Sequence, residues 1–325
     1  MKWHELSQRI LNNGPMSRSE ALAVLESPDE ELLAVLDAAY AVRRHHFGQG
    51  VSIHVIRNAK SGLCTENCSF CSQAAVSKSD IPRYPLQSVA ELVEGAREAK
   101  RLAAVRYCIV TSGRGPLEKD MDVVCEAVRQ IKREIPIQIC TSLGLLTKEQ
   151  AKRLKKAGVD RYNHNLESSE RFYSSFCTTH DYADRVATAK LAKAVDMELC
   201  SGGLMGMGEN VHDRVNLAFA LRDLDADAIP LNFLDPRPGT PLQGLVRMTP
   251  YECLRTLAMF RFVNPDKEIR IAGGREACLG HLQVLSLFAA NSIFTRGYLT
   301  TPGQGLQADL DMIAQAGFHV TEICD

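Results

Sequence analysis

Short apolar and β-branched runs alternate with helix-like segments along most of the chain. The helix-like segments carry apolar residues three and four positions apart, as one buried helix face requires. About eight strand-then-helix units follow one another without a low-complexity linker, which predicts an α/β fold of the (β/α)8 TIM-barrel type. The expected strands are 51–59, 105–112, 137–142, 160–165, 197–203, 228–234, 269–274 and 292–297, and the expected helices are 89–102, 121–133, 148–157, 182–194, 211–221 and 251–263.

Three further helices are expected ahead of the first strand, at 3–12, 18–25 and 29–44. We therefore expect an N-terminal helical extension of residues 1–45 and a barrel of residues 46–325. No GxGxxG motif opens a helix after the first strand and no GxxxxGK[ST] motif occurs, so the sequence gives no support to a Rossmann or P-loop nucleotide site.

Composition narrows the function classes. The 325 residues are 45% hydrophobic and carry 38 basic and 39 acidic side chains, so no broad basic field is expected for nucleic acid or a membrane surface. The N-terminal stretch MKWHELSQRILNNG has no apolar signal-peptide core, and no apolar run reaches about 18 residues. We expect a cytoplasmic protein that acts on a small molecule or a protein partner. Its 11 cysteines then favour metal binding or catalysis over disulfides.

The stretch SGLCTENCSFCSQ places Cys64, Cys68 and Cys71 directly after the first predicted strand, where TIM barrels carry their chemistry. Structural zinc sites use four ligands, and no fourth cysteine or histidine lies close by in sequence. A four-iron cluster also takes four ligands, so three thiolates would leave one iron open for a substrate or cofactor. The spacing favours an iron–sulfur site. Zinc completed by a distant ligand and buried free thiols are the alternatives.

Cysteines also occur inside three other predicted strands, at Cys108, Cys140 and Cys200, and Arg270 lies in a fourth. A single cysteine in a strand is usually a small core residue. Four such positions facing one barrel interior are harder to explain by packing alone.

Several motifs carry a family resemblance. The Cys64-x3-Cys68-x-Phe70-Cys71 spacing resembles the signature of radical S-adenosylmethionine (SAM) enzymes, in which the open iron binds the amino and carboxylate groups of SAM. Over residues 40 to 305 the chain resembles the biotin synthase family in particular. The motifs are IHVIRNAKSGLCTENCSFCSQ, YNHNLESS, LCSGGLMGMGE, FLDPRPGTPL, IRIAGGRE and YLTTPGQG, in that order.

The resemblance implies an enzyme that converts dethiobiotin to biotin by radical SAM-dependent sulfur insertion. It implies two clusters: a [4Fe–4S] cluster on Cys64, Cys68 and Cys71 that cleaves SAM, and a [2Fe–2S] sulfur donor on Cys108, Cys140, Cys200 and Arg270. The arginine ligand comes from the resemblance alone, because a guanidinium is charged and offers no lone pair to a metal.

The resemblance also assigns contacts around the cofactors. Arg106 would lie beside the second cluster and Arg185 would meet the SAM carboxylate, although either arginine, taken alone, fits an ordinary ion pair equally well. Asn165 and Glu167 would contact SAM, and Asn163, Asn165 and Asn232 would contact the substrate, since amides donate and accept hydrogen bonds together. The family usually has Asp where Glu167 stands, which puts its ribose contact in doubt.

The other cysteines match no family ligand, and we interpret them as structural or incidental: Cys125, Cys177, Cys253, Cys278 and Cys324. A flavodoxin or ferredoxin electron donor and a homodimer are further expectations from the resemblance. Two rival hypotheses stay open at this point. One is another radical SAM enzyme on the same barrel, and the other is a non-catalytic cluster protein for electron transfer or redox sensing. A pure electron carrier needs no vacant iron, so the three-cysteine spacing counts against the second rival.

Overall fold

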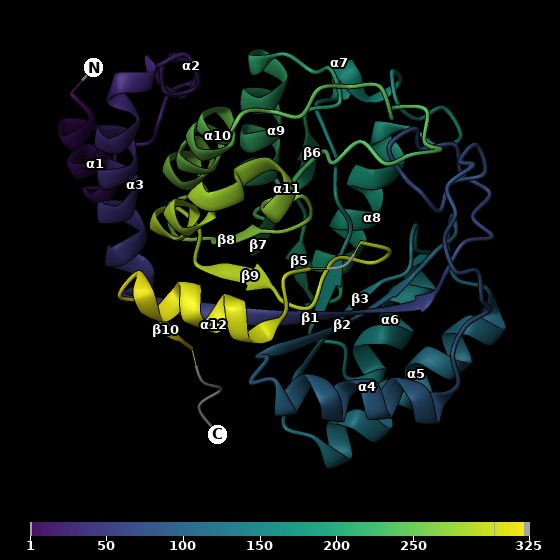
Figure 1. Cartoon of the computed structure of the whole chain (residues 1–325). Coiled ribbons are helices and arrows are strands. Elements are labelled where there is room, and N and C mark those ends of the chain that lie inside the picture. Colours follow the sequence, from purple (N-terminus) through teal and green to yellow (C-terminus); the bar gives the residue numbers. More distant parts are fainter. Residues whose placement is uncertain (1, 302, 322–325) are drawn as a thin grey trace.

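The computed structural model describes residues 2–301 and 303–321, and its centre is a closed parallel β-barrel (Figure 1). The ring runs β1-β2-β3-β4-β5-β7-β8-β9 and closes where β9 pairs with β1. The strands are β1 (Gly50–Lys60), β2 (Arg106–Thr111), β3 (Gln138–Ser142), β4 (Arg161–Asn163), β5 (Glu198–Cys200), β7 (Ala228–Phe233), β8 (Glu268–Ile271) and β9 (Ser292–Phe294). This confirms the predicted TIM-type fold, although several strands are shorter than expected.

Helices cover the outside of the barrel. The main ones are α4 (Val89–Arg101), α5 (Glu118–Glu134), α6 (Lys148–Ala157), α8 (Tyr182–Ala194), α9 (Val211–Asp223) and α10 (Pro250–Val263), close to the predicted bounds. Most of them begin with a capping box, in which a short polar side chain and the residue three positions later satisfy each other's backbone N–H groups. Ser88 with Glu91 starts α4 in this way, and Asp181 with Asp184 starts α8.

The fifth strand of the barrel is broken. We expected one strand over 197–203, whereas the structure has β5 and a separate β6 (Gly203–Met205), which pairs with β7. Gly202 lies at the break and passes so close to β7 that a Cβ atom there would stand 1.9 Å from the Pro230 carbonyl oxygen. Only glycine permits this approach. The break lies directly after Cys200, where β5 ends.

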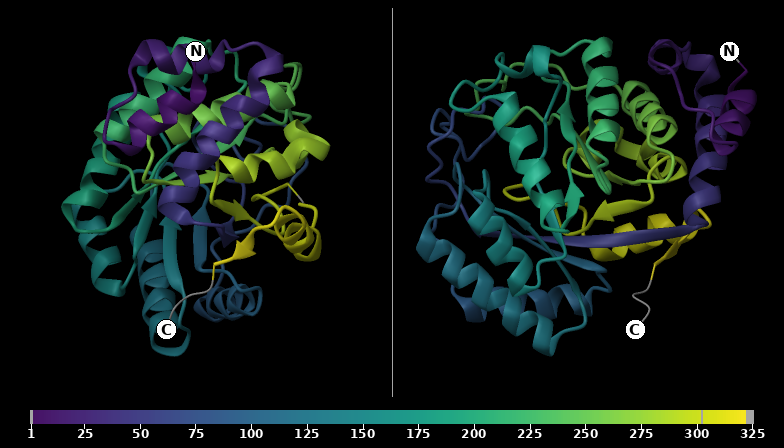
Figure 2. Two further views of the ribbon diagram at one scale, coloured as in Figure 1. Left: turned by 90° about the vertical axis from the view of Figure 1, so that its left-hand side faces the viewer. Right: turned by 180° about the vertical axis from the view of Figure 1, so that it is seen from behind.

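Three helices precede the barrel: α1 (Trp3–Leu11), α2 (Arg18–Leu25) and α3 (Leu32–Phe47), with a short 3-10 turn η1 (Asp29–Glu31) before α3. Helices α2 and α3 pack against α10, and α1 packs against α3. Figure 2 shows the three helices on the side of the barrel opposite α4, α5 and α6. Arg255 on α10 donates to the Ser27 carbonyl at 3.0 Å and to Asp29 at 2.7 Å. Buried Arg43 on α3 donates to the Gly50 carbonyl at 2.6 Å, which ties these helices to β1.

Several short elements have no counterpart in the sequence prediction. They are α7 (Glu170–Tyr173), α11 (Arg275–Leu279), η2 (Gly280–Phe288), α12 (Leu306–Gln315) and β10 (His319–Val320). Figure 1 shows α12 alongside β1, and β10 pairs with the start of β1. Cys324 lies outside the described residues. Within the described chain, no helix combines the length and the apolar character needed to cross a membrane.

A buried ion pair holds α12 to the barrel and generates a stability prediction. Arg275 Nη2 lies 2.5 Å from Asp309 Oδ1, and the two side chains are 2% and 0% exposed. Removing one partner of a buried pair leaves an uncompensated charge, which typically costs about 3–5 kcal/mol. We therefore expect Asp309→Ala to lower the free energy of unfolding by about that amount, measured by urea unfolding. Asp311→Ala, an exposed change on the same helix, should stay within about 0.5 kcal/mol of the parent. Equal urea unfolding midpoints for Asp309→Ala and Asp311→Ala would contradict a stabilising role of the ion pair.

Candidate functional site

A cavity of about 330 Å³ occupies the interior of the barrel at the carboxyl ends of its strands. Alternate residues of the strands supply its wall, as the two-residue period of a strand requires. Nearly all the predicted site residues line this one cavity: Cys64, Cys68, Cys71, Cys108, Cys140, Asn163, Asn165, Glu167, Arg185, Asn232 and Arg270. Cys200 and Arg106 are absent from the described wall but are buried against its residues.

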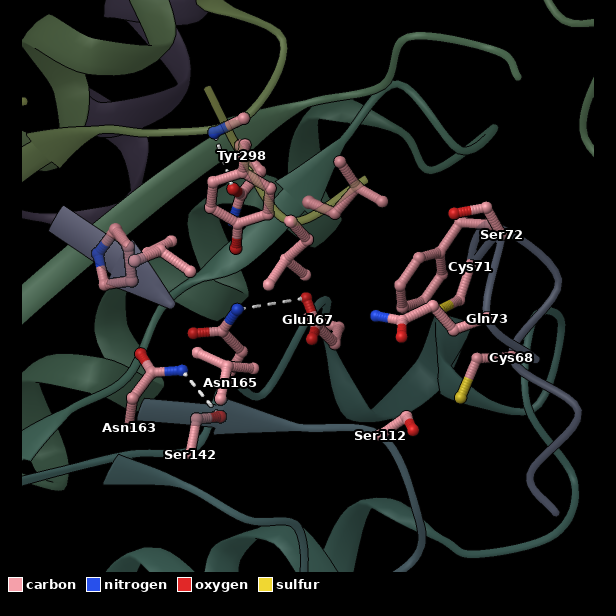
Figure 3. A pocket seen from close by; sticks show the side chains of 18 of the residues that line it. Cys68, Cys71, Ser72, Gln73, Ser112, Ser142, Asn163, Asn165, Glu167 and Tyr298 are labelled. Atoms are coloured by element: carbon pink, nitrogen blue, oxygen red, sulfur yellow. Dashed lines mark hydrogen bonds between the residues drawn. The ribbon is translucent and has the colours of Figure 1, made fainter. Parts of the chain in front are cut away.

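The loop after β1 carries the first three cysteines. Residues Gly62 and Leu63 both have positive φ, which turns the chain sharply as it leaves β1. The backbone N–H of Ser69 donates to the Phe176 carbonyl at 2.9 Å, and this fixes the loop to the segment after α7. In Figure 3 the loop lies on one side of the cavity, with the labelled Cys68 and Cys71 side chains.

Of the loop cysteines, Cys68 is buried and Cys64 and Cys71 are partly buried. Burial raises the pKa of Cys71 to about 11. The Cys177 thiol, 3.6 Å from Cys68, and burial both raise the pKa of Cys68. Cys177, which matches no family ligand, therefore lies directly beside a predicted ligand. Thiols held this way lose their protons readily only when a metal ion takes the charge.

The second set of thiols lies within the barrel strands. Cys108 and Cys140 are direct register partners on β2 and β3, so their side chains point to the same side of the sheet. Arg270 on β8 brings Nη1 to 3.7 Å from the Cys200 Sγ atom. All four residues are at most 4% exposed. The topology thus brings together four positions that span 162 residues of sequence, as the barrel prediction requires.

A charged layer adjoins these thiols, and Glu268 is its centre. Glu268 accepts hydrogen bonds from Arg270, from Arg161 at 2.7 Å and from Ser292 at 2.7 Å, and His54 Nε2 lies 3.0 Å away. Burial opposes its charge, but Arg270 and Arg161 hold the pKa of Glu268 well below its usual value. Burial lowers the pKa of His54 to about 3, so this imidazole is neutral.

Arg106 extends the same layer. Its Nη2 donates to Glu198 at 3.0 Å and to Gln138 at 2.5 Å, while its Nε and Nη1 are buried without a hydrogen-bond partner among the described residues. Arg161 also donates to Glu198, at 2.7 Å. The layer thus holds three arginines against two glutamates. An anionic occupant would satisfy both the excess charge and the orphaned donors.

Two of the predicted amides lie at the end of β4 and just beyond it. Asn163 ends β4 and donates to Ser142 Oγ at 3.3 Å, and Asn165 donates to Glu167 at 3.4 Å, as the dashed lines of Figure 3 show. Glu167 has φ of 67°, and burial raises the pKa of its carboxyl group. Asn165 and Glu167 lie beyond the end of β4 rather than within a strand, yet both still line the cavity.

Asn232 differs from the other amides. Its Nδ2 donates to the Gly203 carbonyl at 3.1 Å, and its Oδ1 accepts from the Gly273 N–H at 2.8 Å. Both ends of the amide therefore pair with backbone of the barrel wall, a structural role that the sequence did not indicate.

Arg185 lies on α8, and its side chain reaches the segment that follows β4. It donates to the Asn165 carbonyl at 2.9 Å and lies 3.8 Å from Glu167. Sequence reasoning missed the residues that surround these groups, namely Glu66, Arg161, His180, Glu198 and Glu268. No short motif contains them, and only a contact prediction across more than 90 residues could have indicated several of these pairs.

Comparisons with known proteins identify the fold and the family of this chain. The family model of the Radical SAM superfamily matches residues 60–221, and that of the Biotin and Thiamin Synthesis associated domain matches residues 230–319. Methylornithine synthase shares the fold, with a TM-score of 0.86 at 20% identity, covering 98% of this chain and 97% of that one. The FeFe-hydrogenase maturase HydG from Carboxydothermus hydrogenoformans has a TM-score of 0.82 at 16% identity, covering 97% of this chain and 78% of that one.

The three-cysteine loop on this barrel, together with the matched superfamily model, defines a radical SAM enzyme. Similar proteins with curated names identify the family within this class. A biotin synthase of Salinibacter ruber is 53% identical over 98% of this chain and 88% of its own length. One from Bacillus subtilis (strain 168) is 49% identical over 99% of this chain and 96% of its own. The chain belongs to the biotin synthase family.

Proposed function

We propose that this enzyme converts dethiobiotin to biotin, with a [4Fe–4S] cluster that cleaves SAM and a [2Fe–2S] cluster that donates sulfur. The observation that carries the proposal is the presence of two separate thiol sets beside one cavity. Cleavage of SAM by itself would need only the loop cysteines. The second set has no evident benefit for packing, because Cys108, Cys140 and Cys200 adjoin a layer of buried charge.

The residues fit both groups. Cys64, Cys68 and Cys71 would hold the four-iron cluster and leave one iron for SAM. Cys108, Cys140 and Cys200 would hold the second cluster with Arg270 beside them, and the excess of arginine over carboxylate suits an anionic group. When bound, the four-iron cluster and SAM supply a carbon-centred radical for hydrogen abstraction, and the second cluster supplies sulfide.

The chain itself supplies position and enclosure. Arg185 would hold the SAM carboxylate, while Asn165 and Glu167 would meet its ribose hydroxyls. Asn163 would bind the ureido ring of dethiobiotin, which both donates and accepts hydrogen bonds. Asn232 would orient the wall through its two backbone contacts and present the edge of its amide to the ring. Because the cavity lies within the barrel, the walls would also keep water from the reacting carbon.

The electron donor, the oligomeric state, the localisation and the roles of Arg106 and the N-terminal helices form part of the same proposal. Electrons would come from a flavodoxin or ferredoxin, the enzyme would act as a cytoplasmic homodimer, and Arg106 would tune the second cluster. Residues 1–45 would serve as a helical extension to a catalytic barrel of residues 46–325. The packing of α2 and α3 on α10 supports a fixed attachment of that extension.

The first cluster assignment is tested with two neighbouring thiols. Cys68→Ala removes one of three cluster thiolates, so we expect loss of the four-iron cluster. Reductive SAM cleavage should fall by about a hundredfold or more, beyond the range of about 10–100-fold that the loss of an outer contact at a metal site costs. Cys177→Ala removes a thiol only 3.6 Å away that is not a proposed ligand, and it should retain both properties. Iron content and 5′-deoxyadenosine formation are the measurements. Cleavage by the Cys68 variant, or its loss in the Cys177 variant alone, would show that the ligands are misassigned.

The source of sulfur is tested by isotope transfer. Protein reconstituted with heavy sulfide should pass the isotope into biotin in a single turnover, while the absorption of the second cluster fades. Cys140→Ala should abolish the transfer because it removes a buried ligand. Arg270→Ala should retain part of it, because a guanidinium is a poor metal donor. Biotin that forms without the label, or forms in protein that holds one cluster type, would contradict the role of Cys108, Cys140 and Cys200.

Substrate recognition is tested at Asn163. When an apolar side chain replaces the one that hydrogen-bonds a polar ring, the buried polar groups of the ring are left unpaired. The affinity for the ring then falls strongly. Asn163→Leu should therefore weaken dethiobiotin binding about a hundredfold while SAM binding changes little. Ser142→Ala removes only the hydroxyl that supports Asn163, and it should have a much smaller effect. Binding of both ligands is measured on reconstituted protein by equilibrium dialysis. Equal losses of the two affinities would place Asn163 away from the substrate.

A further inference from the structure

Arg185 is held by three acceptors that lie on different segments. Its Nε donates to the Tyr173 hydroxyl at 2.5 Å, its Nη1 to the Asn165 carbonyl at 2.9 Å, and its Nη2 lies 3.0 Å from His180 Nε2. A guanidinium is planar, and contacts on three sides fix both its position and the direction of the N–H groups that remain. The residue proposed to bind SAM is therefore oriented by its surroundings before any ligand arrives.

His180 connects this arginine to the cysteine loop. Its imidazole is buried, with 6% of the side chain exposed, and Nδ1 lies 2.5 Å from Glu66 Oε2. Arginine can only donate, so Nε2 must accept, and the ring proton is then on Nδ1, where it donates to the carboxylate. The hydrogen bonds run in one direction, from Arg185 through His180 to Glu66. Nδ1 also lies 3.4 Å from the Cys177 Sγ atom, which can accept from the same N–H.

Glu66 lies between Cys64 and Cys68 and is itself fixed. Its carboxylate also accepts from Thr179 Oγ1 at 2.7 Å, its side chain is 7% exposed, and its carbonyl accepts from Ala75 N–H at 2.9 Å. A movement of the cysteine loop therefore moves the acceptor that holds His180. The loop that would carry the first cluster and the arginine that would hold SAM share one continuous contact.

A metal ion is the competing explanation for this cluster of side chains. Ligand atoms of Cys68, Cys177 and His180 lie within 4.8 Å of one another. However, both imidazole nitrogens are already engaged, one as a donor to Glu66 and one as an acceptor from Arg185. Neither offers a lone pair to a metal unless one of these contacts breaks. The geometry favours a hydrogen-bonding role for His180.

We propose that His180 is a positioning residue for SAM: it couples the cysteine loop to Arg185 and sets the guanidinium at the distance from the open iron that SAM requires. The inference rests on the proposed function and adds a residue to it. SAM has to reach the iron through its amino and carboxylate groups while the same carboxylate meets Arg185. The cysteine loop and Arg185 must therefore be held at a fixed spacing. The hydrogen-bonded chain Glu66–His180–Arg185 holds them there.

The test compares two substitutions at position 180 in full-length reconstituted enzyme. His180→Ala should raise the KM for SAM about 10–100-fold, the usual range for loss of an outer contact at a metal site, with iron content and dethiobiotin binding unchanged. His180→Gln should restore most of the loss, because its amide N–H can donate to Glu66 and its carbonyl can accept from Arg185. The change that SAM produces in the EPR spectrum of the reduced four-iron cluster should weaken in the Ala variant and return in the Gln variant.

Thr178→Val is the matched control. It removes the hydrogen bond that Asn67 donates to the Thr178 hydroxyl at 2.7 Å, a second tie between the same two segments that does not lead to Arg185. This variant should keep the parental KM for SAM. An unchanged KM in His180→Ala, iron loss in that variant, failure of Gln to restore binding, or an equal effect of Thr178→Val would each overturn the inference. If the parent enzyme itself cleaves no SAM, the proposed function fails instead.

Discussion

The interior of this barrel depends on one carboxylate. Arg161 and Arg270 are buried among the strands, and an unpaired buried guanidinium would cost several kcal/mol. Glu268 accepts hydrogen bonds from both and keeps its charge despite burial. Because Glu268 holds one edge of Arg270, another nitrogen of the same guanidinium remains close to Cys200. The position of the arginine beside the second thiol set therefore follows from an ion pair, whatever bonds a bound cluster adds.

The two thiol sets are built differently, and this suits different tasks. Cys108, Cys140 and Cys200 are fixed by strand register, so they move little without disrupting the barrel. Cys64, Cys68 and Cys71 lie on a loop that a few hydrogen bonds attach to the segment after α7. A rigid set suits a group that must stay aligned with the reacting carbon. A loop can admit a cofactor and then tighten around it.

The sequence predicts what is local or periodic. The cysteine spacing, the strand-then-helix order and the lumen positions of Cys108 and Cys140 all follow from patterns within a few residues. It could not predict the Glu66–His180–Arg185 chain, whose first pair is 114 residues apart, or the use of Glu268 by residues on four strands. The backbone pairing of Asn232 depends on the break between β5 and β6, which close approach at Gly202 decides. Polar contacts between residues far apart in the sequence produce no periodic pattern. The hydrophobic pattern therefore predicts which strand residues line the cavity but not which contacts orient their side chains.

These polar contacts explain how the cavity wall can be polar and still hold its side chains in fixed orientations. A buried polar side chain costs free energy unless each donor and acceptor is matched. Here Asn232 meets backbone at both ends, and His180 is paired at both nitrogens. The side chains proposed to meet ligands are therefore held by partners that a ligand does not have to displace. Arg106, next to the strand thiols, by contrast keeps two buried donor atoms without a partner among the described residues, and an anionic cluster would satisfy them. The unpaired donors of Arg106 thus lie where the proposed second cluster would bind, and the paired side chains form the wall around that position.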